Sequence, residues 1–383
     1  MAELTKNLHF LKNGTEQTAK IYTTASEAGS NYITVKVDGT TGYVPIGDIG
    51  NINATMGMVN KSGNTYTILY STLPSLIRTT AIPLSASIWY LASTSVGNYA
   101  LFGGGGNSSS GSNSTVDAYD TSLTRITATA LSKARSYLAA TTVGNYALFG
   151  GGGNSFNVDA YDTSLTRTNP TPLSRGRNYL VATTVGNYAL FGGGGYKDIV
   201  DAYDTSLTRT NPTPLSEARS NLAATSVGNY ALFGGGYGNS TYYNTVDAYD
   251  TSLTRATATP LSKARDELAA TSVGNYALFG GGDHKDIVDA YDTSLTRTNP
   301  TPLSEARSNL AATSVGNYAL FGGGGYNNST VDAYDTSLTR TNPTPLSEAR
   351  GYLASTSVGN YALFGGGFNG GTYYNTVDAY TVS

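Results

Sequence analysis

From residue 88 onward, strand-like stretches and polar turns follow one another in an order that is repeated seven times. In the unit that begins at Asn221, these stretches are "LAATSV", "YALFGGG", "TVDAYDTS" and "TRATATPLS". Each stretch is rich in Val, Thr, Tyr or Phe, is bounded by Gly, Asn or Pro, and lacks a helical period. The pattern therefore predicts four short β-strands in each unit, with "GN" as the hairpin turn between the first two.

The decapeptide "VGNYALFGGG" marks the seven units, and it starts at Val96, Val143, Val185, Val227, Val273, Val315 and Val358. Successive copies begin 47, 42, 42, 46, 42 and 43 residues apart, a spacing typical of propellers and solenoids. Four strands per repeat favour the propeller, because a propeller blade is a four-stranded antiparallel sheet. We therefore predict an all-β, seven-bladed β-propeller.

The strand count also predicts how the ring closes. The last unit has only three strands, whereas "LIRTTAIPLS" at residues 76–85 has the pattern of a fourth strand and precedes the first unit. Pairing of this N-terminal strand with the last three strands would complete the seventh blade and leave no sheet edge bare. We expect residues 76–383 to form the propeller.

The repeat resembles the Kelch family of propellers. The apolar strand "YALFGG" with its double glycine, the Tyr-Asp pair of "AYD" and the segment "PLSEAR" correspond to parts of the Kelch repeat. The tryptophan that the family carries after the Tyr-Asp pair is absent, and Thr210 or Ala256 stands near that place. The resemblance covers about four fifths of the chain and implies a Kelch-like propeller with different outer packing.

Residues 1–75 share no repeat with the rest of the chain. The stretches "NYITVKVDGTTGYVPI" and "MGMVNKSGNTYTILYS" alternate around Gly-containing turns, which predicts a small β module. This segment resembles the N-terminal modules that precede variable distal domains in phage and prophage structural proteins of the tail type. The resemblance implies an attachment module that contacts other virion proteins.

Residues shared by the units are expected to be structural, because seven symmetric copies cannot all form one active site. A strand follows each glycine run, whereas a phosphate-binding loop needs a helix there, so we interpret the glycines as places of close approach between blades. Asp201, Tyr203 and their equivalents are interpreted in the same way. We expect an arginine before the first strand of six units to form hydrogen bonds between blades. The arginines are Arg135, Arg177, Arg219, Arg265, Arg307 and Arg350, and Ile88 takes this place in the first unit.

Variation between the units is confined to one predicted face of the disc. In antiparallel blades, the first-to-second and third-to-fourth turns lie on one face, where "VGN" is identical seven times and "YDTSLTR" recurs six times. The opposite face holds the segments after the glycines, with loop lengths of 10, 5, 5, 9, 5, 6 and 9, and the segments before each first strand. We call this opposite side the variable face.

Large aromatic residues are concentrated on the variable face. Of the 30 tyrosines, 14 belong to fixed motifs and five to the first 75 residues, and the other 11 all lie in variable segments, surrounded mostly by Ser, Gly and Asn. Exposed loops whose sequences vary without selection for binding usually consist of small polar residues. Rigid aromatic residues among small polar ones are instead typical of binding loops. The candidate ligand-binding residues are Trp89, Tyr90, Tyr137, Tyr179, Tyr196, Tyr237, Tyr242, Tyr326, Tyr352, Phe368 and Tyr373.

The composition narrows the range of partners. A formal charge of -3 offers no basic patch for nucleic acid, and no apolar run reaches the length of a membrane span. The start "MAELTKNLHF" lacks the apolar core of a signal peptide. Zero cysteines and two histidines give little support to a transition-metal site. We expect no nucleic-acid partner, no membrane insertion, no cofactor and no metal.

Two other function classes remain open. The variable face offers carboxylates that a polysaccharide-active enzyme would need. Asp283, His284 and Asp286, beside Asp266 and Glu267 of the same blade, form the densest polar cluster, which we interpret as solvated charge rather than a weak calcium or substrate site. The acids are Asp198, Glu217, Asp266, Glu267, Asp283, Asp286, Glu305 and Glu348. Kelch adaptors that bind proteins through one face suggest an interaction scaffold as the other alternative.

The sequence thus predicts a non-enzymatic binding protein that resembles phage receptor-binding proteins. Aromatic faces with amide and hydroxyl groups suit sugar rings and also protein surfaces. We expect a bacterial surface glycan or protein as the ligand, and a location in the virion or outside the cell after synthesis in the cytoplasm.

Overall fold

The computed structural model describes residues 76–107, 111–325 and 327–383 together with the backbone of six strands in the first 75 residues. The chain divides into two compact units, Met1–Ser75 with Ser383, and Leu76–Val382. The first unit contains a hairpin of two strands and a four-stranded sheet of order β4-β3-β6-β5. Its strands are β1 (Asn7–Lys12), β2 (Thr15–Lys20), β3 (Tyr32–Val37), β4 (Thr40–Pro45), β5 (Val59–Lys61) and β6 (Asn64–Ile68). No helix in the described part of the chain is long and apolar enough to span a membrane.

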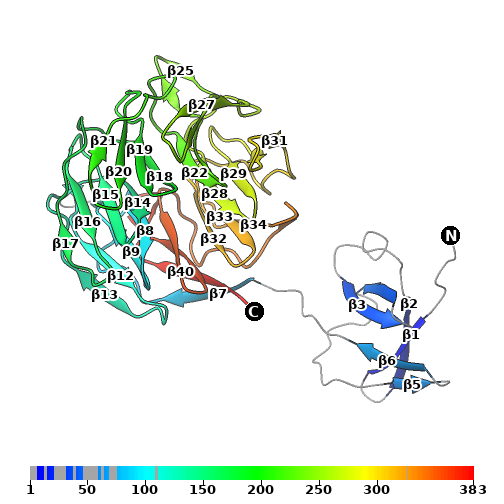
Figure 1. Cartoon of the computed structure of the whole chain (residues 1–383). Helices are drawn as coiled ribbons and strands as arrows, with labels where there is room; N and C mark the ends of the chain where they lie inside the picture. The colour runs from blue at the N-terminus through cyan, green and yellow to red at the C-terminus, as the bar shows by residue number, and fades with distance from the viewer. Residues whose placement is uncertain are drawn as a thin grey trace. The chain divides into compact units, whose positions relative to one another are not determined.

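The second unit is a seven-bladed β-propeller, as the repeat pattern predicts (Figure 1). Seven four-stranded antiparallel sheets surround a central axis, with the first strand of each blade innermost. The first strands are β8 (Ala92–Val96), β14 (Ala139–Val143), β18 (Val181–Val185), β22 (Ala223–Val227), β28 (Ala269–Val273), β32 (Ala311–Val315) and β36 (Ala354–Val358). The second strands are β9 (Tyr99–Gly103), β15 (Tyr146–Gly150), β19 (Tyr188–Gly192), β23 (Tyr230–Gly234), β29 (Tyr276–Gly280), β33 (Tyr318–Gly322) and β37 (Tyr361–Gly365).

The two outer strands of each blade follow the same order. The third strands are β12 (Val116–Tyr119), β16 (Val158–Tyr161), β20 (Val200–Asp204), β26 (Val246–Asp250), β30 (Val288–Tyr291), β34 (Val331–Asp335) and β40 (Val377–Val382). The fourth strands are β13 (Arg125–Ala128), β17 (Arg167–Thr168), β21 (Arg209–Thr210), β27 (Arg255–Ala258), β31 (Arg297–Thr298), β35 (Arg340–Thr341) and, for the seventh blade, β7 (Leu76–Ala81).

The N-terminal strand closes the ring, which confirms the prediction from the strand count. The seventh sheet has the order β36-β37-β40-β7, and β7 pairs with β40 over its full length, from Leu76 opposite Val382 to Ala81 opposite Val377. The strand ends earlier than the expected residue 85. Sequence-distant ends of the propeller are therefore held together by an antiparallel ladder.

Adjacent blades pack through a large side chain set against a glycine. A Cβ atom on Gly150 of the second blade would lie 2.7 Å from the ring of Phe191 in the third, so only glycine permits this approach. Phe191 meets Tyr203 of its own blade edge-on, at 5.9 Å between ring centroids. The hydroxyl of Tyr203 donates a hydrogen bond to the carbonyl of Thr171, 2.8 Å away, in the connection from the preceding blade. These contacts confirm the structural role expected for the glycines and for Tyr203.

A buried ion pair anchors six of the seven connections between blades. Arg177, in the connection to the third blade, has 0% relative exposure, and its Nη2 lies 2.7 Å from Asp201 Oδ2 and donates to the Phe191 carbonyl. Burial lowers the pKa of Arg177, and the negative charge of Asp201 opposes this effect. The equivalent pairs span 2.5–2.8 Å between nitrogen and oxygen. The arginines are structural as expected, although each guanidinium binds within the blade that follows rather than across a blade interface.

The first blade lacks the arginine and keeps the serine and outer-strand arginine contacts to its aspartate that other blades also have. Ile88 is buried in the arginine's place, and Asp117 accepts hydrogen bonds from the amide and the hydroxyl of Ser85 at 2.9 and 2.8 Å. Arg125 on the outer strand lies 3.5 Å from the same carboxylate. The buried carboxylate is therefore partnered in this blade too.

We expect Arg177→Leu to lower the free energy of unfolding by about 3 kcal/mol, because Asp201 would keep a buried charge without its main partner. Arg175→Leu is the matched control, since Arg175 is exposed two residues earlier in the same connection. Urea denaturation of the two variants tests this, and equal stabilities would contradict a structural role for the pair.

A chain that starts at Leu76 should keep the folded propeller, whereas a chain that starts at Ile82 should lose β7 and leave β40 as a bare edge. We expect the shorter chain to melt at a clearly lower temperature and to aggregate. Scanning calorimetry with light scattering measures both effects. The same melting temperature for the two chains would show that β7 contributes little to closure.

Candidate functional site

Seven residues, one from each connection between blades, form a closed ring of backbone hydrogen bonds around the axis. Each lies two residues after the arginine position and donates its amide to the carbonyl of the previous member, with nitrogen–oxygen distances of 2.9–3.2 Å, and Tyr90 closes the ring by donating to Tyr352. The members are Tyr90, Tyr137, Tyr179, Asn221, Glu267, Asn309 and Tyr352. We call this set the mouth ring.

The mouth ring holds an unusual backbone conformation. All seven members have positive φ, between 52° and 60°, a region that suits Gly and Asn and that Tyr and Glu rarely adopt. The closed set of hydrogen bonds supplies the restraint that compensates for this conformation. The backbone is thus the same in all seven connections, and only the side chains differ.

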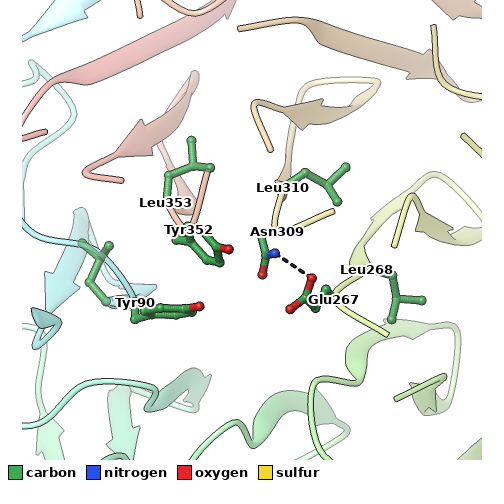
Figure 2. Close-up of a pocket in the computed structure, with 8 residues that line it drawn as sticks. Tyr90, Glu267, Leu268, Asn309, Leu310, Tyr352 and Leu353 are labelled. Atoms are coloured by element: carbon green, nitrogen blue, oxygen red, sulfur yellow. Dashed lines mark hydrogen bonds between the residues drawn. The ribbon is translucent and has the colours of Figure 1, made fainter. Parts of the chain in front are cut away.

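A narrow channel lies below the mouth ring. The residue after each ring member is a leucine, and the next is alanine in six blades and Val181 in the third. The leucines, the residues that follow them and the next residue of each chain segment line a channel cavity of about 230 Å³. All seven innermost strands contribute to this lining. Above the channel, a second cavity of about 170 Å³ is lined by Tyr90, Tyr352, Glu267 and Asn309, with leucines that it shares with the channel (Figure 2).

Seven of the predicted residues form one aromatic cluster on one side of the mouth. Tyr90 contacts Tyr137 and Tyr352 at 4.0 and 4.7 Å between ring centroids, and the cluster continues from Tyr137 to Tyr179 at 4.3 Å. Trp89 lies 4.4 Å from Tyr90. Phe368 and Tyr373 of the seventh blade complete the cluster, at 5.1 and 6.0 Å from Trp89. We call these seven residues the aromatic cluster.

Three longer loops form small hairpins on the variable face, and the second and third of them carry aromatic residues. The hairpins are β10 (Gly106–Asn107) with β11 (Gly111–Ser112), β24 (Tyr237–Gly238) with β25 (Thr241–Tyr242), and β38 (Phe368–Asn369) with β39 (Thr372–Tyr373). Each is joined to its own blade's incoming connection by an isolated bridge, Trp89 with Gly106, Ser220 with Tyr237 and Gly351 with Phe368. Tyr237 and Tyr242 face one another across the second hairpin, at 5.2 Å.

The remaining predicted residues lie outside the aromatic cluster. Tyr196 is 59% exposed and lies 6.4 Å from Tyr237, so Tyr196, Tyr237 and Tyr242 form a smaller group on the third and fourth blades. Tyr326 lies outside the described residues.

Asn221 and Asn309 belong to the mouth ring but were not among the predicted residues, because the prediction considered aromatic residues alone. Both lie two residues after an arginine of the repeat, so an alignment of the seven units on that arginine would have identified them.

The fourth to sixth blades form a polar side of the mouth. Asn309 Nδ2 donates to Glu267 Oε2 at 2.7 Å, and Asn221 Nδ2 lies 3.4 Å from Asp266 Oδ2. Burial, followed by the negative charge of Glu267, raises the pKa of Asp266 to about 6, and Asp283 adds to this effect. The mouth therefore has an aromatic side and an acidic side that face one another.

Two of the other predicted acids form ion pairs with neighbouring residues. Asp283 is paired with Lys285 at 2.6 Å, and Glu217 with Arg219 at 3.1 Å. Within the described residues, no group of His, Asp and Glu could hold a metal ion. The Asp283, His284 and Asp286 cluster therefore offers no ion site of that kind.

The comparisons with known proteins support the fold. No protein-family model matches the chain, and no curated protein matches it. A solved structure described as "Structure of YjhT" is similar over 79% of this chain and 99% of its own, with a TM-score of 0.51 and 13% sequence identity. At this identity the similarity shows a shared propeller architecture alone.

Asp266→Asn should stabilise the protein at neutral pH. The folded-state pKa of about 6 exceeds the ordinary value of 3.8, so ionisation of Asp266 costs stability as the pH rises through this window. The variant removes the charge and keeps an oxygen that can accept from Asn221. We expect a gain of about 1–2 kcal/mol at pH 7.5 that shrinks as the pH falls towards 4. Thermal unfolding at pH 7.5 and 4.5 measures it, and a gain independent of pH would contradict the proposed cause.

Proposed function

We propose that this protein is a non-enzymatic binding protein whose variable face recognises a bacterial surface glycan or protein. The observation that carries the proposal is the mouth ring, in which an invariant backbone presents different side chains. The aromatic cluster supplies contact area, and the amides and carboxylates opposite supply hydrogen bonds, which is the division of labour of binding loops. The propeller fold is compatible with a role as a binding scaffold.

We further propose that the chain is a Kelch-like, tail-type receptor-binding protein of a phage or prophage. The repeat motifs support the Kelch-like assignment, and the resemblance of residues 1–75 to phage attachment modules supports the tail-type role. A module for attachment joined to a diversified disc suits a protein that must recognise changing bacterial surfaces.

A polysaccharide-active enzyme is the second candidate, favoured by one observation. Asp266 has a raised pKa beside the carboxylate of Glu267, and glycoside hydrolysis uses two carboxyl groups of which one has a raised pKa. Release of shorter sugars from a bound polysaccharide, abolished in Asp266→Asn, would favour this candidate over simple binding.

Replacing the four tyrosines of the mouth ring with asparagine tests the binding proposal without disturbing the backbone. Asn221 and Asn309 already occupy equivalent positions with the same positive φ of 55°, so the quadruple variant Y90N/Y137N/Y179N/Y352N should fold. We expect the wild type to bind some members of a panel of bacterial cells and extracted surface glycans. Binding by the variant should be at least tenfold weaker, because the stacking surface is lost.

The matched control changes tyrosines on the opposite, invariant face. Tyr146→Asn and Tyr188→Asn alter two half-buried tyrosines at the start of second strands. We expect this control to keep the binding of the wild type. Equal binding by the quadruple variant and the wild type would refute a site on the variable face.

A further inference from the structure

The cavity at the mouth carries one negative charge and no positive charge. Glu267 is the only charged residue among those that line it. Among the described residues, no ion pair joins Glu267 or Asp266 to a lysine, arginine or histidine. One oxygen of the Glu267 carboxylate accepts from Asn309, which leaves capacity on the other for a further donor.

The negative charges of this side are only partly compensated within the protein, because Asp283 is paired with Lys285 whereas Glu267 and Asp266 are in no ion pair among the described residues. Burial is the main cause of the raised pKa of Asp266, and repulsion by the negative charges of Glu267 and Asp283 raises it further. A positively charged ligand group would relieve this repulsion, whereas a carboxylate or phosphate would increase it. The ligand group that suits the cavity is therefore cationic.

The opposite wall of the cavity also suits a cation. Tyr90 and Tyr352 line it, and Figure 2 shows the hydroxyl end of Tyr90 and the carboxylate of Glu267 pointing towards one another across the opening. Burial, with smaller effects of neighbouring tyrosines, raises the pKa of Tyr90, so its hydroxyl stays neutral. Neutral phenol oxygens accept hydrogen bonds from ammonium groups, and the electron-rich ring faces attract cations.

The ammonium donors and the acceptors of the cavity match in kind. A primary ammonium group has three N–H donors, and the cavity offers a carboxylate, an amide oxygen and two phenol oxygens. Resting on the proposed glycan binding, we propose that this cavity binds the primary ammonium group of an amino sugar, held by Glu267 and by the hydroxyls of Tyr90 and Tyr352. The aromatic cluster then stacks on the neighbouring sugar rings.

The test compares two probes that differ only in N-acetylation. Binding of the full chain to a fluorescent glucosamine tetrasaccharide and to its fully N-acetylated form is measured by anisotropy at pH 6.5. We expect the free amine form to bind at least tenfold more tightly. Glu267→Gln keeps an acceptor for Asn309 and removes the charge, so it should abolish this preference by weakening only the amine form. Glu305→Gln is the matched control, because Glu305 is exposed on the same face, and it should behave as the wild type.

Equal binding of the two probes, no binding of either, or an unchanged preference in Glu267→Gln would each overturn the ammonium proposal. The proposed function is judged by cell binding of the quadruple asparagine variant, which removes Tyr90 and Tyr352 but leaves Glu267 intact, and cell binding of Glu267→Gln then distinguishes the ammonium site from the rest of the face. Cell binding that is lost in that variant and kept in Glu267→Gln would refute the ammonium site while supporting the binding face. Loss of cell binding in both would support the two proposals together.

Discussion

The buried pair of arginine and aspartate is the interaction on which the arrangement of the variable face depends. Each pair fixes a connection between blades against the strands of the blade that follows. The residue two positions after the arginine is thereby placed at the mouth of the channel, and the innermost strand begins two residues further on. Because a buried charge must keep its partner, the position of the connection tolerates little change. In the first blade, Ile88 stands in the arginine position and the connection has the same backbone hydrogen bond as the others. The carbonyl of Ile88 accepts from the Gly367 amide, as the carbonyl of Arg177 accepts from the Gly152 amide.

Closure of the ring makes the position of the backbone independent of the side chains on the variable face. The backbone bonds of the mouth ring and the pairing of β7 with β40 both require seven blades in register. Main-chain atoms supply these bonds, so the side chains of the mouth ring are free to vary. Tyrosine, asparagine and glutamate consequently occupy equivalent positions. This arrangement explains how near-identical repeats can carry one composite site rather than seven equal ones.

The repeat pattern predicted much of the fold, because strand periodicity, glycine turns and strand counting are local signals. The seven blades and the closing strand β7 follow directly from them. The mouth ring could not be predicted, because positive φ at Tyr90 and Glu267 runs against their intrinsic preference and the hydrogen bonds that support it join residues of different blades. Composition also identified the aromatics but not their grouping, since Tyr237 and Tyr242 meet through a two-strand hairpin that the loop sequence does not indicate. The sequence placed Asp266 and Glu267 on the variable face, but it did not indicate that Glu267 shares a ring with Asn221 and Asn309, because that ring is formed by backbone bonds between blades.

The central claim is that ligands bind on the variable face, at the aromatic and acidic sides of the mouth. Hydrogen–deuterium exchange of the full chain, with and without a surface glycan extract from a bacterium that it binds, tests this claim directly. The account predicts slower exchange in the peptides that hold the mouth ring and the hairpins β24–β25 and β38–β39. Protection confined to the invariant "VGN" and "YDTSLTR" turns would place the ligand on the opposite face and contradict the account.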